Sequence, residues 1–210
     1  MHTVNRYRTN VWLAALFYVC LACNDEAGGN KVTVNPTPLP PHNESAVQKG
    51  LDKSPMDMCY FPPDYPVLKI QNKVSGPPVA RVIYSRPQKN GRVIFGNVVK
   101  YGSAWRLGAN EATEIEFFQN VTINKQKINK GRYILYCIPQ EETWTLVLNN
   151  DLYTWGLKID STLDAYKFDI PIARTNFPFE LLTMEFEQAD KGMQLVMEWD
   201  SVRAILPIEY

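Results

Sequence analysis

The chain has 210 residues, 45% of them hydrophobic, and its 22 basic side chains balance its 22 acidic ones. This length and composition fit one globular domain with additional segments. Because the net charge is zero, the molecule lacks the basic character of nucleic-acid-binding proteins, and no nucleic-acid partner is expected.

The N-terminus has the pattern of an export signal. Arg6 and Arg8 precede an apolar run over 11–22, which is too short to span a bilayer because a transmembrane helix needs about 20 residues. The run ends in Leu21-Ala22-Cys23, which resembles the lipobox of bacterial lipoproteins. We predict a lipoprotein signal over 1–22, lipidation of Cys23 and an outer-membrane location, on the periplasmic face or the cell surface. The alternative is an ordinary secretory signal cleaved near Ala22.

Residues 23–50 are predicted to form a disordered, proline-rich tether. They contain few large apolar side chains and have prolines at 36, 38, 40 and 41, so they cannot bury enough surface to offset the entropy of ordering. Both histidines of the chain, His2 and His42, precede the domain predicted for 51–210. Histidine-based metal sites and catalytic triads are therefore excluded from this domain, and we expect no metal and no cofactor.

Two cysteines fall inside the predicted domain, Cys59 and Cys137. An exported protein can keep a disulfide, so a bond between them is one interpretation. The other, which we favour, is two separate thiols, with Cys137 acting as a small apolar residue within a strand.

Short segments of alternating apolar and polar residues follow one another from residue 67 onward. Tyr166, Phe168 and Ile170, for example, alternate with Lys167 and Asp169, which is typical of strands buried on one face. The predicted strands cover 67–74, 79–86, 113–118, 121–123, 127–129, 133–138, 144–148, 166–172, 181–186, 193–199 and 202–206. Before them, prolines at 55, 62, 63 and 66 predict extended coil over 51–66.

About ten short strands joined by polar turns indicate an all-β fold, an antiparallel β-sandwich. A jelly-roll-like arrangement is one possible topology. No segment has a helical period longer than one or two turns.

Residues 84–113 differ from the rest of the domain. They carry five Lys or Arg side chains and one Glu, and Gly91, Gly96 and Gly102 interrupt their apolar runs. This pattern predicts a long irregular crossover between strands, and long ordered loops are often functional. We also expect Gly108 to supply a positive φ for a tight turn.

Arginine side chains suit bidentate contacts with carboxylate or phosphate. We therefore predict that Arg86, Arg92 and Arg106 converge on an anionic ligand. The complete candidate binding site is Tyr84, Arg86, Arg92, Trp105, Arg106, Asn110 and Glu111. The alternative is structural, with the arginines pairing with Glu111 or with loop carbonyls to hold the crossover.

Several motifs carry a resemblance to a known family. They are YSRP at 84–87, GRVIFG at 91–96, YGSAWRLGANEAT at 101–113, GRYILYCIP at 131–139 and WTLVLN at 144–149. Together they resemble domain of unknown function 2911, a family found largely in exported bacterial proteins. The resemblance implies a domain over 51–208 and no particular activity. Where the family usually has Trp-Arg-Thr-Gly, this chain has Leu107 in place of the threonine, so it lacks that hydroxyl.

Three functions remain open from the sequence. The first is a non-enzymatic, membrane-tethered β-sandwich that binds a small anionic molecule, a glycan or an envelope protein through the crossover. The second is a structural or assembly subunit of an envelope complex. The third is an enzyme with Glu111 as base and Arg86 or Arg106 stabilising negative charge; without a Ser-His pair or phosphate loop, we favour it least.

Overall fold

A computed structural model of the chain describes residues 54–210. The predicted signal, Cys23, the tether and the first residues of the predicted domain lie outside the described residues. The described elements are β1 (Met56–Phe61), α2 (Tyr65–Ile70), β2 (Ala80–Ser85), β3 (Glu114–Phe117), β4 (Val121–Ile123), β5 (Gln126–Ile128), β6 (Gly131–Pro139), β7 (Thr143–Asn149), η1 (Ser161–Leu163), β8 (Asp164–Ala189) and β9 (Gly192–Glu209).

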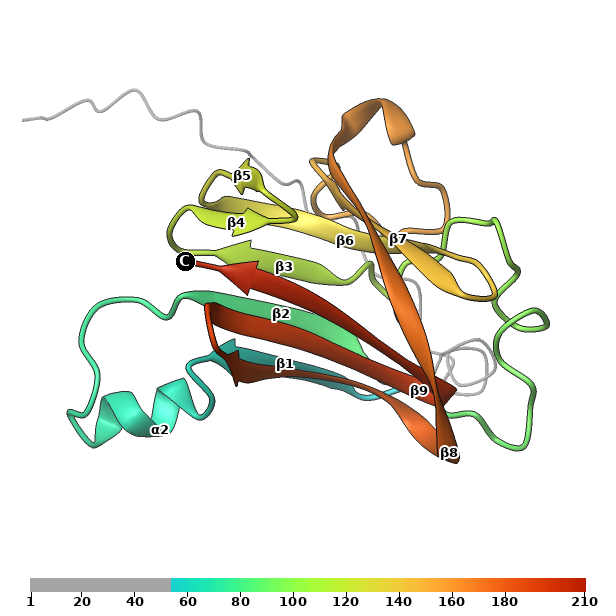
Figure 1. Cartoon of the computed structure of the whole chain (residues 1–210), viewed down its shortest axis with the longest axis horizontal. Helices are drawn as coiled ribbons and strands as arrows, with labels where there is room; N and C mark the ends of the chain where they lie inside the picture. The colour runs from blue at the N-terminus through green and yellow to red at the C-terminus, as the bar shows by residue number, and fades with distance from the viewer. Residues whose placement is uncertain (1–53) are drawn as a thin grey trace, which may run out of the picture. The chain divides into compact units, whose positions relative to one another are not determined.

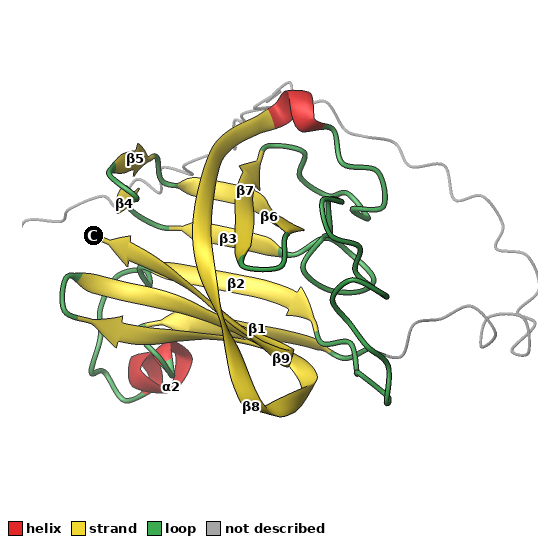
Figure 2. Ribbon diagram, turned by 45° about the vertical axis from the view of Figure 1, so that its right-hand side comes forward, coloured by secondary structure: helices red, strands yellow, loops and turns green. Residues whose placement is uncertain are grey.

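The strands form one antiparallel sheet in the order β1-β2-β3-β6-β7-β8-β9-β4-β5, which confirms the all-β prediction. The long strand β8 turns this sheet back on itself. Up to Pro171 it pairs with β7, and from Ile172 onward it pairs with β9. The second half of β8 and β9 consequently lie against β1 and β2 (Figures 1 and 2). The result is a sandwich-like arrangement of two layers.

The core lies between these layers and follows the predicted alternation. Phe168 and Ile170 are buried, as are Leu182, Met184 and Phe186 farther along β8. The inward-facing side chains Met193, Leu195, Met197 and Trp199 of β9 are also buried. The two-residue period of these strands thus correctly predicts which face packs against the core.

The topology is mainly a meander, because most neighbouring strands in the sheet are also neighbours in the chain. It is not the interleaved order of a jelly roll. The last four predicted strands are joined in pairs, since β8 has 26 residues and β9 has 18. The expected breaks are irregularities within continuous strands: the pairing register shifts on either side of Phe179, and Asp200 has a φ of 50°.

The proline-rich segment that precedes the domain core differs from its prediction. Six residues without proline, between Pro55 and Pro62, form β1 at the edge of the sheet rather than coil. Prolines are tolerated beside an edge strand because they interrupt no central hydrogen-bond ladder.

The predicted strand over 67–74 is also wrong, because the chain forms α2 there. Pro66 occupies the first turn of this helix, where its missing N–H leaves no bond unmade. Tyr65 is the only buried residue of the helix, and its hydroxyl donates to the carbonyl of Gly76. One buried residue gives the sequence of α2 little helical periodicity, so its pattern resembles that of a strand. No helix in residues 54–210 is long and apolar enough to cross a membrane.

Both cysteines of the domain are free thiols, as the favoured interpretation predicted. Cys59 lies in β1 and Cys137 in β6, with β2 and β3 between them. Three strand spacings of about 4.8 Å place β1 and β6 roughly 14 Å apart, whereas a disulfide needs Cα atoms about 6 Å apart. Burial raises the pKa of the Cys59 thiol to about 12, so this group stays protonated and unreactive near neutral pH.

Candidate functional site

The crossover between β2 and β3 is tied to both layers of the sandwich. At its start, the Lys89 N–H donates to Glu180 O of β8 at 2.7 Å. Near its end, Trp105 and Cys137 of β6 exchange two backbone hydrogen bonds, of 2.7 and 2.8 Å. The crossover therefore spans one end of the sandwich, and both views show it there beside the loop that precedes β8 (Figures 1 and 2).

The inner side of the crossover completes the core. Ile94, Phe95, Val99 and Leu107 are buried, and the Phe95 ring lies 5.3 Å from that of Trp144. The Ile94 N–H also donates to the Asp200 carboxylate, at 3.2 Å. Although it contains no regular strand, this loop is therefore held by packing on one side and by hydrogen bonds at both ends.

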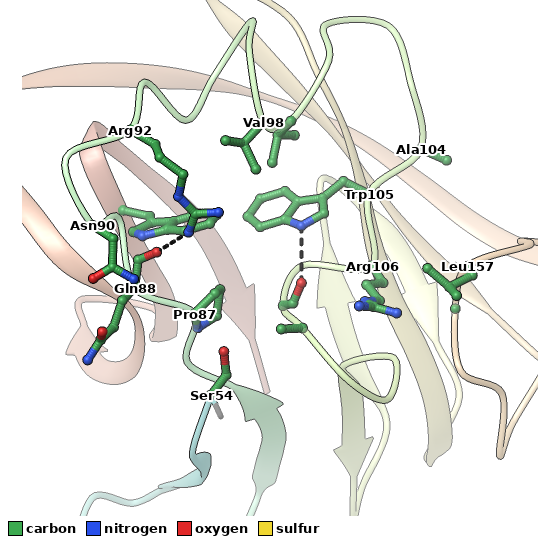
Figure 3. Close-up of a pocket in the computed structure, with 15 residues that line it drawn as sticks. Ser54, Pro87, Gln88, Asn90, Arg92, Val98, Ala104, Trp105, Arg106 and Leu157 are labelled. Carbon is green, nitrogen blue, oxygen red and sulfur yellow. Dashed lines mark hydrogen bonds between the residues drawn. The ribbon is translucent and has the colours of Figure 1, made fainter. Parts of the chain in front are cut away.

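The outer side of the crossover encloses a pocket of about 690 Å³ (Figure 3). Most of its lining comes from the crossover. Ser54, Gly156, Leu157 and Trp199 complete it from other parts of the domain. This volume lies within the usual range of small-molecule sites, roughly 300–1,000 Å³.

The pocket has a fixed aromatic wall. The Trp105 indole extends across it, and its Nε1–H donates to Gly108 O at 3.3 Å (Figure 3). Trp199 stacks against Trp105 with ring centroids 5.7 Å apart and an interplanar angle of 22°. Because both rings also contact Phe95, packing on several sides fixes the position of the Trp105 indole.

Two of the three predicted arginines line this pocket. Arg92 and Arg106 lie on either side of the Trp105 indole (Figure 3). The Arg92 guanidinium is held by loop carbonyls, with Nε donating to Lys89 O at 2.9 Å and Nη2 donating to Gln88 O. Arg106 Nη1 donates to Trp155 O at 3.1 Å. Loop carbonyls thus hold both cations at the pocket, as the structural alternative predicted for contacts with loop carbonyls.

No Asp or Glu side chain is among the described residues that line this pocket. The nearby carboxylate of Asp200 is 3.6 Å from Lys89 Nζ and accepts the Ile94 N–H, so it is engaged outside the lining. Arg92 and Arg106 are therefore the only charged side chains among the described residues that line the pocket.

Arg86 belongs to a different environment. It bridges β1 and β8, donating to the Asp57 carboxylate at 3.1 Å, to Leu182 O at 3.1 Å and to Thr183 Oγ1 at 2.9 Å. It does not line the pocket, so the predicted convergence of three arginines is wrong. Arg86 is structural, although its partners are Asp57 and strand β8 rather than the predicted Glu111 or loop carbonyls.

Tyr84, predicted as a wall of the site, is also part of the core. Its side chain is buried, and its hydroxyl accepts the Met184 N–H at 2.8 Å. The same hydroxyl lies 3.3 Å from the Asp57 carboxylate. Burial is the main cause that raises the pKa of Tyr84 well above 10. Tyr84 and Arg86 together join β2 to the opposite layer.

Asn110 and Glu111 lie outside the pocket. Asn110 Nδ2 donates to Ser54 O at 3.3 Å and so closes the crossover onto the start of β1. Glu111 is exposed and lines a separate hollow of about 170 Å³ with Glu114, Tyr153 and Trp155. The structure therefore does not place Glu111 in one cavity with Arg92 and Arg106.

The expected role of Gly108 needs correction. Its neighbour Leu107 has the positive φ, 53°, and is fully buried. Gly108 is needed for space, because a Cβ there would lie 3.2 Å from Ser85 O and 3.3 Å from Thr113 Oγ1. Leu107, at the position where the family usually has threonine, thus contributes to the core rather than to the pocket.

The sequence did not predict several lining residues. Gln88 and Asn90 stand beside Arg92 in the crossover, where their position between charged and glycine residues was the available signal. Trp199 follows the core alternation of β9, and nothing local indicates that it reaches a pocket. Leu157 comes from a loop for which no site was predicted.

Comparisons with known proteins give one match. No curated protein and no solved structure matches the chain. A family match does cover residues 66–208, which include the crossover and all of the strands except β1 and the end of β9. The chain belongs to the family described as a protein of unknown function (DUF2911).

Proposed function

We propose that this protein is a ligand-binding β-sandwich whose crossover pocket captures a small anionic molecule, held in the outer envelope by a lipid on Cys23. The observation that carries the proposal is the lining of the pocket. Arg92 and Arg106 lie beside the Trp105 wall, with no carboxylate among the described lining residues. Such a cavity favours a ligand that combines negative charge with an apolar face.

The fixed backbone of the crossover supports a binding role. Its inner side chains are buried, and its ends are hydrogen bonded to β6 and β8, so the pocket exists before a ligand arrives. A preformed site avoids much of the ordering entropy that binding otherwise costs. An enzymatic role for Glu111 gains no similar support, because Glu111 lines a different hollow.

The test of binding is a thermal melt of the full-length chain with citrate, inorganic phosphate and galacturonate as separate probes. We expect at least one of these anions to raise the melting temperature, because a ligand that binds the folded state stabilises it. Arg106→Ala should abolish this increase.

Arg174→Ala is the matched control. Arg174 is an exposed arginine that donates to a loop carbonyl, Glu141 O at 2.9 Å, as Arg106 does to Trp155 O. Arg174 does not line the pocket, so its replacement should preserve the anion response. If none of the three anions stabilises the wild-type protein, the proposed function is wrong.

The proposed lipid anchor has an independent test. Cells expressing the chain would be labelled with a radioactive fatty acid, and the wild-type protein and Cys23→Ser would be compared. Label on the wild type alone supports lipidation. Equal absence of label from both would contradict it, leaving the binding proposal unaffected.

A further inference from the structure

Each side of the pocket suits a different part of a ligand. The Trp105 indole supplies a flat apolar wall, and Arg92 with Arg106 supplies the positive charge. Gln88 and Asn90 line the pocket on the side of Arg92, where the Asn90 amide adds a polar group and the Gln88 amide points away from the Trp105 indole (Figure 3). A ligand that uses all three features has an apolar face, an anionic group and several hydroxyl groups.

We infer that the ligand is an acidic carbohydrate, a sugar ring that carries a carboxylate. This inference rests on the proposed function and specifies the ligand of the same pocket. The axial C–H groups of a sugar form an apolar face that packs on an aromatic ring. Its carboxylate would pair with guanidinium groups, in the geometry that arginine recognises best.

The Asn90 amide favours a polyhydroxylated ligand over an aromatic acid. Among residues 54–210, the Asn90 amide makes no hydrogen bond to another protein group, and Asn90 is exposed at the pocket. An amide both donates and accepts, so it matches neighbouring hydroxyls of a sugar. An aromatic acid would leave the exposed Asn90 amide hydrogen bonded to water alone.

One arginine also has an available donor. Loop carbonyls occupy Nε and Nη2 of Arg92, whereas no acceptor among the described residues bonds to its Nη1. The two carbonyl bonds fix the plane of the guanidinium. Nη1 can therefore donate to a carboxylate without a change in the loop.

The rim of the pocket is open, as an oligosaccharide requires. Val98 is 45% exposed and Leu157 is 74% exposed, so the side chains at two edges of the pocket stand in solvent. A sugar chain could enter at this rim and continue beyond it. A fully enclosed cavity would admit only a single unit.

The experiment compares trigalacturonate with two controls by isothermal titration calorimetry of the full-length chain. Maltotriose has the sugar rings without the carboxylates, and citrate has three carboxylates without a ring. We expect trigalacturonate to bind at least about 10-fold more tightly than either control, because each control lacks one of the two recognised features. Arg106→Ala should weaken trigalacturonate binding by about 10-fold or more, and Arg174→Ala should not weaken it.

Proton saturation-transfer NMR on the wild-type protein tests the aromatic contact without a variant. Saturation of the aromatic protein protons should pass most strongly to the axial ring protons of one galacturonate unit. Trp105→Phe, which keeps a smaller aromatic ring, should reduce this transfer and bind trigalacturonate several-fold more weakly.

The outcomes distinguish the anion-binding function from the identity of the ligand as an acidic carbohydrate. If citrate binds as tightly as trigalacturonate, the carbohydrate inference is wrong and the anion-binding function stands. If maltotriose binds as tightly as trigalacturonate, the carboxylate is not recognised. That result would overturn the inference of an acidic carbohydrate and the role assigned to the arginines. If no probe binds, both fail.

Discussion

Arg86 and Arg106 belong to the same basic segment of the sequence but occupy different environments in the fold. Arg86 spans the two layers, with bonds to Asp57, Leu182 and Thr183. Arg106 lies at the pocket and is positioned by the carbonyl of Trp155. The difference arises from the surroundings of each cation. Arg86 follows directly after β2 and contacts β8. Arg106 follows Trp105, the aromatic wall of the pocket, at the end of the sandwich that the crossover spans. Charge alone therefore does not identify which arginine lines the pocket.

This contrast predicts that Arg86→Ala reduces stability more than any other substitution considered below. The change leaves the Leu182 carbonyl and the Asp57 carboxylate without their guanidinium partner, which should lower the free energy of unfolding by about 2–3 kcal/mol. Urea denaturation would measure it. The pocket is not lined by Arg86, so the remaining folded protein should still respond to the anion probes.

Gly156→Ala should disturb both regions. Gly156 has a φ of 72°, and a Cβ there would lie 2.9 Å from the Cβ atoms of both Arg106 and Ala112. Left-handed backbone costs a non-glycine residue about 1–2 kcal/mol, so the free energy of unfolding should fall by at least this amount. Because the clash also displaces Arg106, anion binding should weaken. Unchanged denaturation and binding would show that the loop is not packed against the crossover as described.

Tyr84→Phe should lower the free energy of unfolding by about 1–2 kcal/mol near neutral pH, because the buried Met184 N–H loses its acceptor. Its second effect depends on pH. Burial raises the pKa of Tyr84 above its ordinary value of 10.0, so above about pH 10 the unfolded chain loses this proton first and the wild-type protein loses stability.

The Tyr84→Phe variant lacks this ionisation. The difference in unfolding free energy between wild type and variant should therefore shrink as the pH rises above 10, measured by denaturant unfolding at several pH values. A difference that stays constant from pH 8 to 11 would mean that the hydroxyl is not buried as described.

Arg92→Ala should have the smallest of these effects on stability, about 0.5–1 kcal/mol, because within residues 54–210 this exposed side chain bonds only to the loop carbonyls of Lys89 and Gln88. Its effect on anion binding should instead resemble that of Arg106→Ala. Calorimetric titration of Arg92→Ala with trigalacturonate would measure it, with Arg174→Ala as the reference. Binding equal to that of the reference would exclude Arg92 from the site.

The sequence predicts the sheet better than the site, for a physical reason. Alternation along β8 and β9 identifies core residues because each strand has only two faces. The local pattern predicts two short strands in place of each long one, because the irregularities near Phe179 and Asp200 resemble turns. Similarly, α2 was missed because only one of its residues is buried.

The crossover was recognised from its glycines and cations, but the roles of its residues depend on distant partners. Arg86 becomes structural through residues about a hundred positions later in the chain, Leu182 and Thr183. Trp199 becomes part of the pocket because β9 folds back across the sheet. Neither relationship leaves a local pattern, whereas the family motifs did identify the segment that contains the pocket.

The most direct test of this account pairs two measurements on Arg86→Ala and Arg106→Ala. The melting temperature would be recorded for each variant without ligand and with the anion that stabilises the wild-type protein most. We predict that Arg86→Ala has a lowered melting temperature and retains the anion-induced increase, whereas Arg106→Ala shows no anion-induced increase. The opposite pattern, with binding lost in Arg86→Ala and retained in Arg106→Ala, would contradict the division between a structural and a ligand-binding arginine.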